Sequence, residues 1–163
     1  MKKNSIKGFT LIELLVVVAI IGVLAAVGVT AFQGFVESSK VSAMKNMHAG
    51  AVKKIAAELQ KCNMGEDKFF QGTRASNGGT YNGQDCHATS ANTNAQRAKT
   101  GFRDTSTDKN PWKSTESAYL SSTRHTIGRI AIQNTGPRVI VRTCWKDPCG
   151  SSGNSATGVA QAE

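Results

Sequence analysis

The sequence lacks the residue patterns on which enzymes depend. It has three histidines, His48, His87 and His125, and none of them belongs to a His-Glu-x-x-His motif. It also contains no nucleophile elbow and no phosphate-binding glycine loop. Its Gly78-Gly79 pair lies in a polar loop, where turns account for the glycines. We therefore expect a protein that is not an enzyme and that uses no cofactor and no metal.

Charge is absent from a long stretch near the N-terminus. The 23 residues from Leu14 to Val36 carry no charged side chain, and a membrane helix needs about 20 apolar residues. A cleaved secretory signal is an alternative, but its apolar core is only about 7–15 residues long. A plain membrane anchor explains the length but not Glu13, since a carboxylate at the head of such a segment marks a function with a specific partner.

The residues around that carboxylate resemble a known signal. The run Lys7-Gly8-Phe9-Thr10-Leu11-Ile12-Glu13-Leu14-Leu15 is similar to the class III signal of type IV pilins and type II secretion pseudopilins. The resemblance covers about the first 40 residues. It implies that prepilin peptidase cuts between Gly8 and Phe9, that residues 1–8 are a cleaved leader, and that Phe9 becomes the N-methylated first residue.

The same resemblance implies a mode of assembly. Residues 9–36 would form a transmembrane and assembly helix, in which Glu13 pairs with the N-terminal ammonium of a neighbouring subunit. Glu13 has an alternative role, because a carboxylate at a helix N-terminus stabilises its own helix through the macrodipole. The N-terminus would lie in the cytoplasm, and the subunit would wait in the inner membrane as a single-pass protein. An inner-membrane assembly platform would then add it to an extracellular helical filament.

Acidic residues are scarce relative to basic ones. The chain has 20 Lys and Arg against 11 Asp and Glu, a formal net charge of +9, and a basic surface attracts polyanions. The alternative is a solvated surface with no partner. The candidate polyanion-binding residues are Arg97, Lys99, Arg103, Lys113, Arg124, Arg129, Arg138 and Arg142.

The four cysteines all follow the apolar segment, where an oxidising environment favours disulfides. Four cysteines allow three connectivities. We favour Cys62–Cys86, which would tie the end of the helix to the loop after it, and Cys144–Cys149, which closes a short loop containing Pro148. A zinc site is the alternative, but the spacing is poor for it.

The remainder, residues 37–163, is expected to be an exposed globular domain. An apolar stripe with helical spacing, from Val41 to Leu59, continues the helix to about Gln60. Residues 61–116 are polar and predict a long loop with little regular structure. Alternating strands are predicted in the region 117–145, at Ser117–Thr123, Ile127–Gln133 and Arg138–Cys144, with a turn at residues 134–137 and a flexible tail at residues 150–163.

These features predict an α+β fold. A long N-terminal helix, with a transmembrane first half, packs on an antiparallel sheet of three or four strands, and the C-terminal region is closed by a disulfide. The order of these elements and the resemblance of the N-terminal segment together predict a type IV pilin-like fold. The expected function is a structural subunit of a type IV pilus for adhesion, motility or DNA uptake. The alternatives are a minor pilin that binds DNA or a host or abiotic surface, and a type II secretion pseudopilin.

Overall fold

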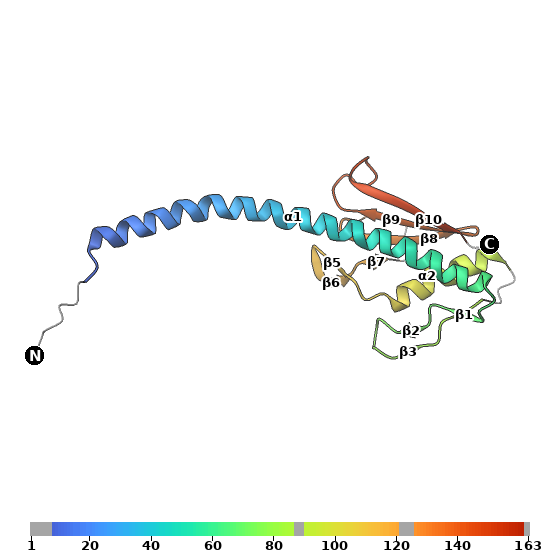
Figure 1. The fold of residues 1–163 in the computed structure, drawn as a ribbon. Coiled ribbons are helices and arrows are strands. Elements are labelled where there is room, and N and C mark those ends of the chain that lie inside the picture. The colour runs from blue at the N-terminus through green and yellow to red at the C-terminus, as the bar shows by residue number, and fades with distance from the viewer. Residues whose placement is uncertain (1–7, 87–89, 121–125, 162–163) are drawn as a thin grey trace, which may run out of the picture. The chain divides into compact units, whose positions relative to one another are not determined.

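The computed structural model describes residues 8–86, 90–120 and 126–161. The chain divides into two compact units, Met1–Ser39 and Lys40–Glu163, which we call the N-terminal and C-terminal units. The long helix α1, Leu11–Asn63, contributes to both (Figure 1). The other elements lie in the C-terminal unit, whose boundary falls a few residues beyond the position 36/37 expected from the sequence.

The second part of α1 carries the predicted apolar stripe. Met44, Ala51, Ile55 and Leu59 are buried, at spacings that place them on one face of a helix. This confirms the expected stripe. The helix ends at Asn63, slightly later than predicted, two residues before Gly65, whose φ of 87° is one that glycine adopts without strain.

The main sheet has four strands in the order β10-β9-β8-β7. Strands β8 (Arg129–Thr135) and β9 (Arg138–Cys144) form an antiparallel hairpin around Gly136 and Pro137, which confirms the predicted pair of strands. Strand β9 has the predicted bounds, whereas β8 lies two residues later than predicted, so the turn is shorter than the expected residues 134–137. Along β9 the side chains of Val139, Val141 and Thr143 are buried, as the alternation predicted. The α+β class is therefore confirmed.

Strand β7 (Tyr119–Leu120) departs from the predicted antiparallel meander, because it pairs with β8 in parallel. Parallel neighbours need a connection longer than a hairpin turn, and eight residues separate Leu120 from Arg129 in the sequence. The predicted strand Ser117–Thr123 thus reduces to Tyr119–Leu120 within the described residues, and residues 121–123 lie outside them.

The expected flexible tail at residues 150–163 is wrong for half of its length. Residues Ser155–Gln161 form β10, which pairs with all seven residues of β9 from Ser155↔Cys144 to Gln161↔Arg138. Its small side chains hid the strand in the sequence, because they offer little apolar area. They are required by packing: an added Cβ at Gly158 would lie 2.4 Å from Cγ2 of Val52 on α1.

The expected long loop at residues 61–116 is also wrong. It contains α2 (Ala91–Thr105) and three small antiparallel sheets. Helix α2 begins at the cap Ser90, whose hydroxyl accepts from the Thr93 N–H, and it buries Ala95, Ala98 and Phe102 along one face. The small sheets pair β1 (Lys68–Phe69) with β4 (Gln84–Asp85), β2 (Gly72–Thr73) with β3 (Thr80–Tyr81), and β5 (Lys109–Asn110) with β6 (Lys113–Ser117).

The core of the C-terminal unit joins α1, α2 and the main sheet. Three aromatic rings pack in a row in this core: Phe70, which follows β1, meets Phe102 on α2 edge-to-face at 6.1 Å, and Phe102 meets Tyr119 on β7 at 4.8 Å between ring centroids. Two disulfides close the unit. Cys62 at the end of α1 is bonded to Cys86 after β4, and Cys144 at the end of β9 is bonded to Cys149.

Close packing at Gly158 leads to a first prediction. Gly158→Ala should lower the free energy of unfolding by about 1–3 kcal/mol, because Val52 is branched and cannot move aside. Adding Val52→Ala should recover part of that loss in a double-mutant cycle measured by denaturant unfolding. Gly50→Ala is the control, since an added Cβ there meets nothing within 4 Å. Additive effects of the two changes would show that the contact is not tight.

The half-buried His48 on α1 leads to a second prediction. Its Nδ1 lies 2.8 Å from the Thr143 hydroxyl, and burial lowers its pKa. The unfolded chain then takes up the proton near pH 6.5, whereas the folded chain takes it up only at lower pH. Stability should be complete above about pH 6.5 and should decline as the pH falls from there toward the folded pKa.

Urea unfolding of the detergent-solubilised chain between about pH 8 and pH 5 measures this decline. The matched variant is His48→Gln, which cannot titrate, so its stability should change less over the same pH range. The other two histidines are present in both proteins and cancel in the comparison. An identical pH profile for the two proteins would contradict the assignment.

Candidate assembly site

The head of α1 is closed by a reciprocal set of hydrogen bonds. Oε2 of Glu13 accepts from the Thr10 backbone N–H and from the Thr10 hydroxyl, both at 2.8 Å. The Glu13 N–H in turn donates to the Thr10 hydroxyl at 3.3 Å. This is a capping box, in which two backbone donors that a helix leaves unpaired find side-chain partners.

Thr10 is the functional residue that the sequence reasoning missed. Its signal was present, because Thr10 and Glu13 have the Ser/Thr-x-x-Glu spacing of a capping box directly before an apolar run. The cap occupies one oxygen of the carboxylate. Among the described residues no donor reaches the other oxygen, Oε1, so Glu13 keeps an acceptor for a group from another chain.

The bond expected to be cut lies ahead of the helix. Gly8, Phe9 and Thr10 have no regular structure, and α1 begins at Leu11. Phe9 is 84% exposed, and a Cβ added at Gly8 would meet no atom within 4 Å. Among the described residues nothing therefore covers the Gly8–Phe9 peptide. The rest of the expected leader, residues 1–7, lies outside the described residues.

The N-terminal unit has apolar side chains on every face of its helix. By length and composition α1 could cross a membrane. A helix that is apolar all round is stable only in lipid or enclosed by other protein. In the single chain its large apolar side chains are exposed, from 46% at Val17 to 87% at Leu11. They are Phe9, Leu11, Ile12, Leu14, Leu15, Val16, Val17, Val18, Ile20, Ile21, Val23, Leu24, Val27, Val29, Phe32 and Phe35.

Several of the candidate polyanion-binding residues already have partners. Arg103 contacts the Asp104 carboxylate at 2.9 Å, and Arg129 contacts the Glu116 carboxylate, which Lys113 also approaches at 3.5 Å. Two more bind neutral acceptors: Arg97 donates to the carbonyl of Asp85 and Lys99 to the amide oxygen of Asn134. The bonds of Arg97, Lys99 and Arg129 tie separate elements together, and the Asp104 and Glu116 carboxylates reduce the charge offered to a ligand.

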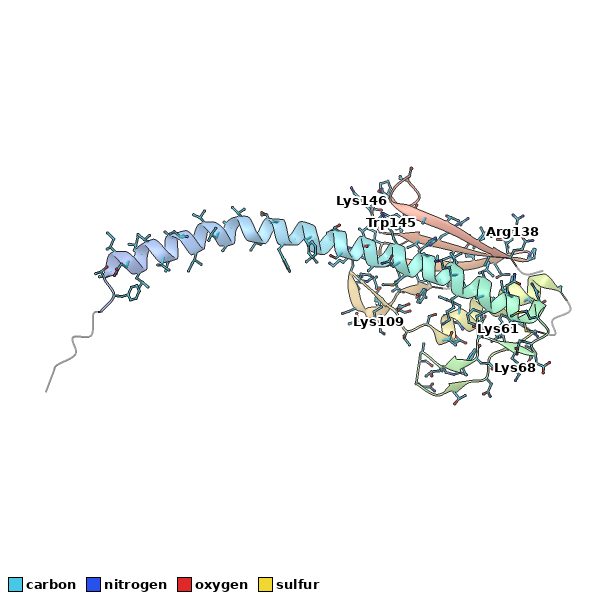
Figure 2. All side chains as sticks on the ribbon, in the orientation of Figure 1. Lys61, Lys68, Lys109, Arg138, Trp145 and Lys146 are labelled. Carbon is cyan, nitrogen blue, oxygen red and sulfur yellow. A yellow bond between two sulfur atoms is a disulfide. The ribbon has the colours of Figure 1, made fainter. Side chains whose placement is uncertain are left out.

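The structure also spreads these residues over separate elements. Arg97, Lys99 and Arg103 lie on α2, Lys113 on β6, Arg129 on β8, and Arg138 and Arg142 on β9. Arg124 lies outside the described residues. Figure 2 labels one member of the set, Arg138. The described members are thus divided among four elements, α2, β6, β8 and β9.

Other titratable groups offer no catalytic or metal-binding arrangement in the part of the chain that the structure describes. No group of three or more His, Cys, Asp or Glu side chains gathers there to hold a metal. His48 is engaged with Thr143, while His87 and His125 fall in the segments left undescribed. Tyr119 donates to the Asp108 carboxylate, and burial raises its pKa well above the usual range, so it stays protonated.

Known proteins share the N-terminal part of this chain. Residues 3–29 match the family described as the prokaryotic N-terminal methylation motif. The fimbrial protein EcpC of Eikenella corrodens is 50% identical over 50 residues, which is 31% of this chain and 33% of that protein. The type IV major fimbrial protein FimA of Dichelobacter nodosus is 45% identical over 62 residues, 37% and 38% of the two chains.

A third relative has the same extent of similarity. The type IV major alpha-pilin of Moraxella bovis is 41% identical over 56 residues, 34% of this chain and 35% of that protein. The chain thus spans about a third of the length of the curated relatives it matches. No solved structure matches it.

The Arg129–Glu116 pair leads to a prediction that separates a paired cation from a free one. The hydrogen bond from Arg129 lowers the Glu116 pKa below its usual value. Arg129→Gln should raise that pKa toward the usual value, while Arg138→Gln, on the neighbouring strand β9, should leave it unchanged. Carbon NMR titration of the Glu116 carboxyl measures both. An unmoved Glu116 pKa in Arg129→Gln would contradict the pairing.

Proposed function

Because the chain carries the N-terminal segment of the type IV pilin family, we propose that it is a structural subunit of a type IV pilus. The observation that supports this most strongly is the all-round exposure of apolar side chains from Phe9 to Phe35. Such a surface is compatible with two environments, a lipid bilayer and a bundle of identical helices. A filament subunit needs both, first for storage and then for assembly.

Glu13 is the residue that sets the register in this proposal. Apolar burial stabilises by about 25 cal/mol per Å² wherever it occurs, so it cannot by itself choose one alignment of two apolar helices. The Glu13 oxygen Oε1, which the cap leaves available, would accept from the N-terminal ammonium of Phe9 in a neighbouring subunit. A misaligned neighbour would leave a charge without its partner in apolar surroundings, at a cost of about 3–5 kcal/mol.

The remaining steps follow from the same segment. Prepilin peptidase cuts after Gly8, which frees the amino group of Phe9 as the ammonium that Glu13 needs, and then methylates it. The subunit lies in the inner membrane with its N-terminus in the cytoplasm until the assembly platform moves it into the filament. The exposed C-terminal unit would then form the filament surface, where adhesion, motility or DNA uptake would take place.

The two alternatives have weaker support. A DNA-binding minor pilin would need phosphate contacts along one groove, whereas the described cations are dispersed and several already bind acceptors. A secretion pseudopilin would share the N-terminal segment. The relatives reported above carry the names of fimbrial proteins and an alpha-pilin, and this favours the pilus.

Two matched substitutions at the head of α1 test the assembly role of Glu13. Glu13→Gln keeps the capping box, because glutamine also serves at that position, but it removes the negative charge. Thr10→Val removes the capping hydroxyl and keeps the charge. Each variant replaces the subunit in a pilus-assembling strain that lacks its own copy, and filaments are counted by electron microscopy.

We expect Glu13→Gln to reduce filament number at least about tenfold, as an unpaired ammonium at each interface would, and Thr10→Val to assemble. Mass spectrometry of membrane subunits should find both variants cut before Phe9. Normal filaments from Glu13→Gln would refute the docking role. Loss of filaments from Thr10→Val alone would assign the effect to the helix cap.

A further inference from the structure

The C-terminal unit contains a hollow of about 360 Å³ that has no part in the proposed assembly. Three segments that are distant in the sequence form it: the turn after β2, the C-terminal end of α2, and the strands β5 and β6. Backbone contacts hold these segments together, since the Ala75 N–H donates to the Asp104 carbonyl at 2.7 Å and Lys109 pairs with Ser117 across the two strands. The hollow is therefore part of the built fold.

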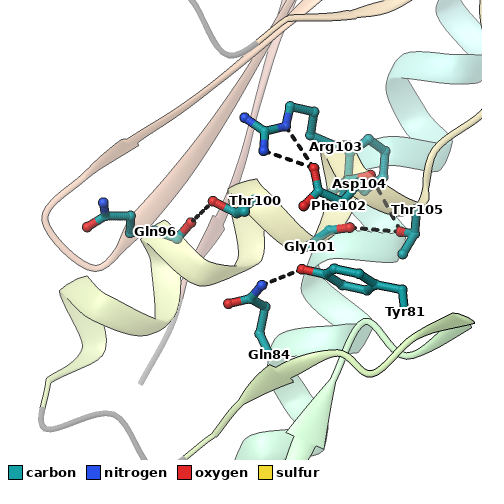
Figure 3. Close-up of polar contacts among 9 residues, drawn as sticks. All are labelled: Tyr81, Gln84, Gln96, Thr100, Gly101, Phe102, Arg103, Asp104 and Thr105. Atoms are coloured by element: carbon teal, nitrogen blue, oxygen red, sulfur yellow. Dashed lines mark hydrogen bonds and ion pairs between the residues drawn. The ribbon is translucent and has the colours of Figure 1, made fainter. Parts of the chain in front are cut away.

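The lining of this hollow is basic. Arg74, Arg103 and Lys109 contribute three cations, and Asp104 is the one acidic residue among the lining residues that the structure describes. Arg103 and Asp104 neutralise each other, because both Nε and an Nη of Arg103 lie 2.9 Å from one Asp104 oxygen (Figure 3). Arg74 and Lys109 are left as a net charge of two.

The guanidinium of Arg74 has a fixed orientation in the structure. Its guanidinium carbon lies 5.1 Å from the centre of the Tyr81 ring, a cation–π contact that orients the group. The turn that carries it is closed by backbone bonds from Arg74 to Gly79 and from Gly78 to Arg74. A planar guanidinium with a fixed orientation loses little entropy when it binds a carboxylate through two parallel hydrogen bonds.

Carbonyl and carboxylate oxygens near the hollow already accept hydrogen bonds from other groups of the chain. The C-terminal end of a helix attracts cations, which would oppose an anion at this end of α2. There the Thr105 hydroxyl donates to the Gly101 carbonyl at 2.9 Å (Figure 3), and the Asp104 carbonyl accepts from Ala75. The carboxylate of Asp108, next to Lys109, accepts from the Tyr119 hydroxyl.

We propose that this hollow binds a sugar acid, a saccharide unit with a carboxylate group. Arg74 and Lys109 would bind the carboxylate, and the hydroxyls of Ser76, Thr107 and Ser117 in the lining would bind the sugar hydroxyls. A volume of about 360 Å³ is at the lower end of ligand pockets, which suits one sugar unit. On the surface of a filament, many copies of such a site would bind an acidic polysaccharide with high avidity.

The test uses the full chain in a polyoxyethylene detergent, whose headgroup contains no sugar. Saturation-transfer NMR compares methyl β-D-glucuronide with methyl β-D-glucoside, which has a hydroxymethyl group in place of the carboxylate. We expect the glucuronide to bind and the glucoside to give no signal. Sodium sulfate is added as a competitor at the same concentration, and it should displace little of the glucuronide because it lacks the sugar hydroxyls.

Variants locate the site. Arg74→Gln and Lys109→Gln should each weaken glucuronide binding about tenfold, the effect of losing one hydrogen bond to a charged group. Arg138→Gln removes the same charge from β9, outside the hollow, and should bind as the original chain does. Lys109 is exposed, so its variant decides the matter if Arg74→Gln does not fold.

Three results would overturn the proposal. Equal weakening by Arg138→Gln would show that net charge alone attracts the sugar. Equal binding of the glucoside would show that the carboxylate is not recognised, and full displacement by sulfate would show a general anion site. None of these measurements requires filaments, so a failure here leaves the assembly role untouched, and a failure of the Glu13 test leaves this site untouched.

Discussion

The structure depends on one constraint: the helix from Leu11 to about Phe35 has no polar face to turn toward water. Such a helix must be buried completely, in lipid or among other helices. Apolar burial is strong but without direction, so a specific assembly needs a directional group. Glu13 is the one charged side chain in this segment. Its carboxylate is shared between a cap for its own helix and an acceptor that stays available.

Beyond Ser39 the same helix is apolar on one face only. There the apolar residues lie on one face of the helix, which includes Met44, Ile55 and Leu59. This face packs in the core of the C-terminal unit. Here packing is close enough that β10 needs glycine at position 158 beneath Val52. The two halves of α1 thus face different partners. In the proposed filament the first half packs against copies of itself, whereas the second half packs on one particular sheet. The relatives match this chain over only about a third of its length.

Sequence reasoning succeeded where a pattern is local and regular. The helix stripe and the hairpin of β8 and β9 are set by periods of 3.6 and 2 residues, which neighbouring residues carry. It failed for α2 and β10, and for a physical reason. Strand β10 uses mostly alanine, glycine, serine and threonine, whose small side chains give a weak periodic signal. Helix α2 has Ala95, Ala98 and Phe102 at helical spacing, but they lie in a segment otherwise rich in polar residues. The stability of both elements comes from contacts with α1 and the main sheet, which the local sequence does not show.

The sequence by itself determined the apolar span, the peptide bond expected to be cut, the position of the carboxylate and the strands of the central hairpin. Each is a continuous run of residues, a short motif or an alternation along a strand, so the sequence shows it without the fold. Only the tertiary structure decided which cations are free. It paired Arg129 with Glu116, and it brought Arg74 to the same hollow as Lys109. Charge pairing falls off over a few ångströms, so it follows distances in the folded chain and not spacing along it.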